Sequence, residues 1–93
     1  MKLATQDKPF YSSEIEQKLL EIKDMGFDAF EIDGAYLIEK FDKVEAAVRN
    51  TSVDISSVCG GYRGWIGHFN EERRMQAISD IENILKRAGS IGA

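Results

Sequence analysis

The sequence predicts an α/β fold built on a parallel sheet, because the same arrangement recurs along its 93 residues. Short apolar segments have the length and the β-branched content of buried strands, and turn residues bound each of them. Amphipathic segments with helical periodicity separate these strands. The return from one strand to the next takes about 25 residues, which is typical of a crossover helix between parallel strands.

The first unit consists of a strand at residues 2–6, a loop fixed by the only proline, Pro9, and a helix. Ser12 or Ser13 can cap this helix, and residues 13–16 (SEIE) match a capping box, in which a serine cap is followed three residues later by a glutamate. Apolar residues at helical spacing then extend the helix to Met25, and Gly26 is predicted to end it as a C-cap glycine.

Two further units follow the same plan. The second strand is predicted at residues 29–32, and a single helix is predicted from residue 36 to about residue 50. The third strand covers residues 55–59 and leads into a glycine-rich loop. The last helix is expected to begin at an asparagine cap, Asn70, and to end near Gly89.

Composition limits the possible partners and the location of the protein. The net charge of −4 argues against nucleic acid as a partner. The single cysteine, Cys59, has no internal disulfide partner and is interpreted as a small apolar residue rather than a nucleophile. The amino terminus does not resemble a signal peptide, and no apolar run approaches the roughly 20 residues needed to cross a bilayer. A cytoplasmic protein with no membrane partner is therefore predicted.

The loop after the third strand is the first candidate for a functional site. Residues 60–70 contain four glycines, and aromatic, basic and imidazole side chains alternate with them. Loops at the carboxyl ends of strands are where α/β proteins place binding residues. The alternative is a structural loop whose aromatic residues pack over the end of the core.

Several segments, in this order, resemble the opening of the xylose-isomerase-like TIM barrels, a superfamily that includes sugar-phosphate isomerases and epimerases. They are residues 1–6, 25–32, 55–59 and 72–93. The most specific of them is residues 25–32 (MGFDAFEI), in which a helix end is followed by Gly-Phe-Asp and a strand that contains Glu31. The resemblance spans the whole chain but corresponds to about three of the eight βα units of such a barrel.

This resemblance implies that residues 1–93 are the amino-terminal part of a single (β/α)8 barrel domain, truncated before its fourth strand. A complete three-stranded small domain is the alternative. The resemblance also implies a divalent metal, Mn²⁺, Mg²⁺, Co²⁺ or Zn²⁺, bound in the whole barrel by side chains of later strands. Neither metal ligands nor catalytic residues are assigned to this portion, which is expected to be inactive alone. The remainder of the barrel or further copies of the chain are the expected protein partners.

The resemblance assigns possible substrate contacts to five side chains. Glu31, at the end of the second strand, is expected to orient a substrate hydroxyl, or otherwise to form a salt bridge. Tyr62 and Trp65 are expected to form a wall against a sugar ring, or otherwise to pack as a lid. His68 is a candidate hydrogen-bonding or acid/base group, and Arg63 a candidate contact for a phosphate or carboxylate. The alternative is that His68 and Arg63 are solvated loop residues.

The functional prediction is therefore the amino-terminal portion of a metal-dependent sugar or sugar-phosphate isomerase or epimerase. In such enzymes a proton moves between adjacent carbons of a ketose or aldose. The alternatives are a dehydratase or a phosphodiesterase or endonuclease of the same superfamily, and a non-catalytic small-domain binding protein.

Overall fold

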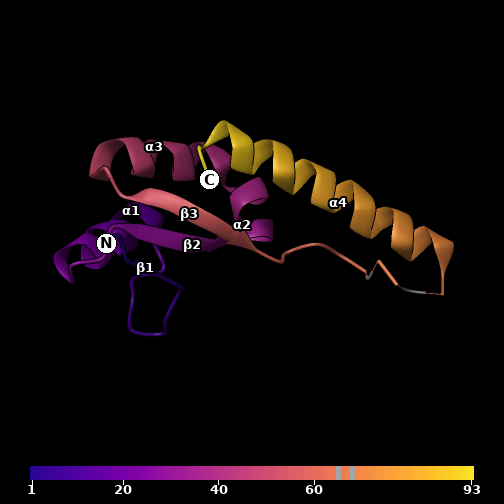
Figure 1. Cartoon of the computed structure of the whole chain (residues 1–93), viewed down its shortest axis with the longest axis horizontal. Helices are drawn as coiled ribbons and strands as arrows, with labels where there is room; N and C mark the ends of the chain where they lie inside the picture. Colours follow the sequence, from indigo (N-terminus) through magenta and orange to yellow (C-terminus); the bar gives the residue numbers. More distant parts are fainter. Residues whose placement is uncertain (65, 68) are drawn as a thin grey trace.

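The structure is a computed structural model that describes residues 1–64, 66–67 and 69–93. Its elements are, in chain order, β1 (Ala4–Thr5), α1 (Ile15–Asp24), β2 (Ala29–Asp33), α2 (Gly34–Glu39), α3 (Phe41–Thr51), β3 (Asp54–Cys59) and α4 (Glu71–Ser90). The strands form a parallel sheet in the order β1-β2-β3, which confirms the predicted strand order. The molecule measures 45 × 26 × 24 Å and is elongated because the first half of α4 extends past the sheet (Figure 1).

Helices cover one face of this sheet. Phe30 and Ile32 of β2 and Ile55 of β3 are each 2% exposed and belong to one apolar core. The helices and loops contribute the other members of that core, which are Tyr11, Ile15, Leu19, Ile22, Leu37, Val44, Ala47 and Val53. In Figure 1, α3 and α4 lie along the same side of the sheet. Burial of each large aliphatic side chain in this core contributes about 1.5–3 kcal/mol to stability.

The cap of α1 differs from the predicted capping box. Glu14, rather than Ser13, is the N-cap residue, and its carboxylate accepts hydrogen bonds from the backbone N–H groups of Glu16 (3.1 Å) and Gln17 (2.7 Å). These two bonds lower the pKa of Glu14 below its ordinary value. A glutamate side chain that folds back onto its own helix satisfies two amino-terminal N–H groups, and its negative charge also suits the helix dipole.

The single helix predicted for residues 36–50 is in fact two helices. α2 begins at the N-cap Asp33, whose carboxylate accepts a hydrogen bond of 3.0 Å from the backbone N–H of Tyr36. Lys40 interrupts the helix with a φ of −116° and a ψ of 31°. The break lets α2 pack against α4 while α3 packs against α1. Leu37 and Val44 are both fully buried and seven residues apart, so the apolar periodicity continues across the break and does not reveal it.

The prediction that residues 1–93 form the first three units of a TIM barrel is wrong. The described residues form a three-stranded sheet that stays open, with β1 and β3 as its edge strands. β1 is only two residues long, shorter than the predicted strand at residues 2–6. The fold is therefore an open parallel α/β sheet with helices packed on one face. Alternating strands and helices are equally typical of open and closed parallel sheets, so the sequence periodicity did not distinguish the two.

Two glycines allow the backbone at the start of α2 to contact the backbone just after β3. A Cβ atom added at Gly34 would lie 2.2 Å from the carbonyl oxygen of Gly60. A Cβ atom added at Gly61, which has a φ of +86°, would lie 2.2 Å from the backbone nitrogen of Ala35. Both distances are far below van der Waals contact, so this packing requires glycine at the two positions.

We predict that Gly61→Ala lowers the free energy of unfolding by at least about 2 kcal/mol, because alanine is strained at this φ and its methyl group overlaps α2. The matched control is Gly89→Ala in α4, where the added methyl group meets no atom within 4 Å. That change should be neutral or stabilising by up to about 1 kcal/mol. Urea unfolding followed by circular dichroism measures both, and equal midpoints for G61A and the wild type would contradict the proposed contact.

Candidate functional site

The uncovered face of the sheet is polar at the carboxyl ends of its strands. Along β2, Glu31 and Asp33 alternate with the buried Phe30 and therefore lie on the face opposite to the helices. In the parallel register of β3, Ser57 is the partner of Glu31, and Cys59 is the partner of Asp33. Four polar or sulfur-containing side chains thus lie on one face of two neighbouring strands.

A β-bulge in β3 accounts for this arrangement. Phe30 pairs with Ile55, but the next residue of β2, Glu31, pairs with Ser57, so Ser56 is the extra residue. In a regular strand, Ser57 would lie on the same face as the buried Ile55. The bulge instead places Ser57 on the open face beside Glu31, which is the kind of reorientation that bulges commonly provide next to functional sites.

The Glu31 carboxylate accepts a hydrogen bond from each neighbouring strand segment. Gln6, directly after β1, donates from Nε2 to Glu31 Oε2, and Ser57 donates from Oγ to Glu31 Oε1 at 3.0 Å. We refer to Gln6, Glu31 and Ser57 as the Glu31 cluster. Because each carboxylate oxygen has its own donor, the orientation of the Glu31 side chain is fixed before any ligand arrives.

A cavity of about 230 Å³ lies beside this cluster, and its walls are acidic. The residues that line it are Gln6, Asp7, Glu31, Asp33 and Cys59. Two of the carboxylates also make structural bonds: Asp33 caps α2, and Asp7 forms a salt bridge of 2.9 Å with Lys18, whose side chain is only 10% exposed. The cavity is smaller than the roughly 300–1,000 Å³ of typical ligand pockets, so it suits one edge of a ligand rather than a whole one.

Arg63, the predicted contact for a phosphate or carboxylate, is bound to a carboxylate of the chain itself. Its backbone N–H and its Nε donate to Asp80 Oδ2 at 2.8 and 3.0 Å, and its terminal Nη2 donates to Asp80 Oδ1 at 3.1 Å. These bonds lower the pKa of the Asp80 carboxyl and raise that of the Arg63 guanidinium. Arg63 also lines a separate cavity of about 300 Å³, with residues of α2 and α4. It therefore ties the loop after β3 to α4.

The structure does not bring Tyr62 together with Glu31. Tyr62 is 37% exposed and is not among the residues that line the cavity beside the Glu31 cluster. Trp65 and His68 lie outside the described residues. Cys59, interpreted from the sequence as a small apolar residue, is exposed at the end of β3.

The sequence reasoning missed Gln6 and Ser57. Gln6 follows the first strand directly, so the rule that singled out Glu31, a polar side chain at a strand end, would also have found it. Ser57 had no comparable signal. Simple alternation from the apolar Ile55 places Ser57 on the buried face, and only the bulge reverses that assignment.

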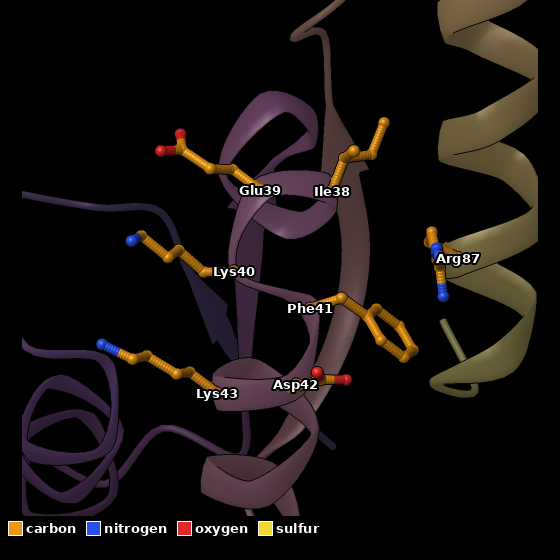
Figure 2. A pocket seen from close by; sticks show the side chains of 7 residues that line it. All are labelled: Ile38, Glu39, Lys40, Phe41, Asp42, Lys43 and Arg87. Atoms are coloured by element: carbon orange, nitrogen blue, oxygen red, sulfur yellow. The ribbon is translucent and has the colours of Figure 1, made fainter.

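A further cavity, of about 390 Å³, lies between the α2–α3 junction and the end of α4. There the Arg87 guanidinium stacks over the Phe41 ring at 4.7 Å from its centroid. Figure 2 shows Phe41 directed toward Arg87, whereas Glu39, Lys40 and Lys43 extend to the opposite side. Glu39, Lys40 and Lys43 therefore do not converge with Arg87 on one binding site (Figure 2).

The metal implied by the family resemblance was assigned to later strands of the barrel, so the described residues do not test it and it stays a prediction. Among these residues, no three His, Cys, Asp or Glu side chains are grouped so that they could hold a metal ion. None of the helices in the described ranges is long and apolar enough to cross a membrane. The cytoplasmic location and the self-association remain predictions.

Comparison with known proteins identifies a related enzyme. No family model matches the chain. Over 92 residues, 99% of the chain, it is 45% identical to 3-dehydro-D-guloside 4-epimerase from Escherichia coli strain K12. Among solved structures, it matches the crystal structure of 3-keto-D-glucoside 4-epimerase, YcjR, from E. coli in its apo form, with a TM-score of 0.92 and 44% identity. The chain spans 35% of the length of each of these proteins.

These matches correct the resemblance inferred from the sequence. The relationship found is to a sugar 4-epimerase, and no family model supports the xylose-isomerase-like superfamily. The predicted similarity to sugar epimerases is confirmed in this coarse form. The structural match also covers the open face, because it extends over 99% of the chain.

We predict that the Arg63–Asp80 pair gives the protein an acid-sensitive increment of stability. Since the folded-state pKa of Asp80 lies below its ordinary value of 3.8, the increment is present above about pH 4 and is lost as the pH falls further. At neutral pH, Asp80→Asn should lower the melting temperature by roughly 1–4 °C, a small change because exposed ion pairs contribute little.

Melting curves of the wild type and D80N between about pH 2 and pH 7 measure this difference. Glu82→Gln, an exposed change on the same helix, is the control and should follow the wild type throughout. A difference between D80N and the wild type that does not shrink on acidification would show that the ion pair is not its source.

Proposed function

We propose that this protein is a sugar epimerase that acts on a keto sugar, and that the Glu31 cluster binds hydroxyl groups of that sugar. The observation that carries the proposal is the Glu31 carboxylate, held between Gln6 and Ser57 on the open face of the sheet. A fixed carboxylate at the carboxyl end of parallel strands is a typical acceptor for ligand hydroxyls. The 45% identity to 3-dehydro-D-guloside 4-epimerase supports the choice of a keto sugar.

The chemistry of such a substrate explains what a binding residue must do. A carbonyl at C3 makes the hydrogen at C4 acidic, because the anion left by its removal is an enolate. Inversion at C4 then requires that the proton leaves one face of the ring and that a proton returns to the other face. The ring must keep its orientation between these two transfers, so fixed contacts to its hydroxyls are needed. We assign this orienting role, and no proton transfer, to the Glu31 cluster.

The charge of the cavity favours a neutral sugar over a sugar phosphate. Three of the five residues that line it are carboxylates, those of Asp7, Glu31 and Asp33, and none of the five is basic. A phosphate dianion placed there would be repelled. Arg63, the candidate phosphate contact, is bound to Asp80 and lines another cavity.

We predict that the chain binds methyl 3-keto-β-D-glucopyranoside at the Glu31 cluster and that Glu31→Gln weakens the affinity about 5- to 20-fold. The physical reason is the loss of a charged acceptor for a sugar hydroxyl. Titration of the sugar into ¹⁵N-labelled protein, followed by NMR, gives both the affinity and the residues affected. The matched control is Glu45→Gln on the exposed surface of α3, which should bind like the wild type.

A second titration, with the 6-phosphate of the same sugar, tests the charge argument. The phosphorylated sugar should bind at least about 10-fold more weakly, and added salt should reduce the difference because it screens the repulsion. Shift changes confined to the Arg87 cavity, or equal affinities of E31Q and the wild type, would refute the proposed site.

A further inference from the structure

We infer that the Glu31 cluster binds the hydroxyl groups along one edge of the sugar, so that the ketone oxygen points away from the cluster. This inference rests on the sugar-binding function proposed for the same residues and adds an orientation to it. The orientation follows from the positions of the protons in the cluster. The hydrogen bonds described above determine these positions.

The proton positions follow from the nature of a carboxylate. An ionised carboxylate only accepts hydrogen bonds, so Ser57 must use its single hydroxyl proton toward Glu31 Oε1. For the same reason, Gln6 must turn its NH₂ group, not its carbonyl, toward Glu31 Oε2. The Ser56 hydroxyl lies 3.5 Å from that of Ser57. Any hydrogen bond between them therefore runs from Ser56 to Ser57.

The groups left for a ligand are almost all acceptors. Glu31 retains lone pairs on both oxygens, Ser57 retains lone pairs on its hydroxyl, and Gln6 retains its side-chain carbonyl. Asp7 and Asp33 add carboxylate oxygens to the same cavity. Only the second N–H of the Gln6 amide remains as a donor in the cluster.

A keto sugar presents two kinds of oxygen to such a surface. Its hydroxyls donate and accept, whereas the ketone oxygen only accepts. A hydroxyl that faces the Glu31 cluster gains a charge-assisted hydrogen bond, while a ketone that faces it meets acceptors of like partial charge. The hydroxyl edge is therefore the side that binds, and the ketone faces away from Glu31.

The bulge at Ser56 contributes to this arrangement of hydrogen-bond acceptors. It brings Ser57 to the open face, where its hydroxyl donates to Glu31 Oε1. Ser57 is therefore a positioning residue, because it acts on the sugar mainly through the orientation of Glu31.

Fluorinated sugars test the inference directly. The probes are methyl 3-keto-β-D-glucopyranoside and its analogues in which the hydroxyl at C2, C4 or C6 is replaced by fluorine, which does not donate. At least one analogue should bind the wild-type chain about 5- to 10-fold more weakly than the parent sugar. Methyl β-D-glucopyranoside, which has a hydroxyl in place of the ketone, should bind within about 2-fold of the parent, since the ketone makes no contact with the cluster.

Variants separate positioning from a general loss of structure. Ser57→Ala should reduce the affinity for the parent sugar about 3- to 10-fold. It should also reduce the differences in affinity among the fluorinated probes. Ser57→Thr, which keeps the hydroxyl, should restore both. Ser79→Ala on the exposed surface of α4 is the matched control and should leave both unchanged.

The outcomes distinguish this inference from the proposed function. If the parent sugar binds at Glu31 but all fluorinated analogues bind equally well, the hydroxyl orientation is overturned and the sugar-binding site stands. If removal of the ketone, rather than of a hydroxyl, abolishes binding, the orientation is reversed. If the parent sugar does not bind at all, both proposals fail. The fluorinated probes on the wild-type chain test the orientation of the sugar even if S57A does not fold.

Discussion

The architecture depends on the one-sided burial of the sheet. Phe30, Ile32 and Ile55 all pack into a single core with the helices, and strand geometry then forces their neighbours onto the opposite face. On β2 those neighbours are Glu31 and Asp33, which would be costly to bury without partners. The polar open face is therefore a direct consequence of the apolar one. A change that reversed the alternation of β2 would bury two carboxylates and expose part of the core at the same time.

The carboxyl ends of the strands are held in place mainly by backbone contacts. The start of α2 touches the chain just after β3, which only glycines at positions 34 and 61 permit. A few residues later, Arg63 fastens the same loop to Asp80 of α4 through its main chain and its side chain. Both contacts lie outside the hydrophobic core. They fix where β3 ends, and the position of Ser57 relative to Glu31 depends on that.

The elements that the sequence predicts well are those in which one local signal acts alone. Strands β2 and β3 and the Asn70 cap of α4 are found within a residue or two of their predicted bounds. The local signals fail where two residues compete for the same structural position, or where tertiary contacts determine the local structure. Glu14 replaces Ser13 as the cap of α1, and the partners of α2 and α3 break the helix at Lys40. An open sheet and a closed one share the same periodicity. For the candidate site, strand position indicates Glu31, but the bulge that brings Ser57 to it has no local sequence signature.

In the proposed function, the Glu31 cluster contributes only part of the affinity and sets the orientation of the sugar. A hydrogen bond exchanged with water contributes only about 0.5–1.5 kcal/mol net, and the cavity beside the cluster is open to solvent. What the cluster adds is a carboxylate whose orientation is already fixed, so a correctly placed hydroxyl meets an acceptor that does not need to be ordered. Affinity for a sugar ring must then come from apolar contact with its carbon–hydrogen face, which aromatic side chains supply most effectively. Tyr62, partly exposed three residues after β3, carries such a ring, and its role as a wall for the sugar remains a prediction. We therefore expect Tyr62 to add to the affinity and the Glu31 cluster to set the orientation, so that substitutions at the two places have different effects on sugar binding.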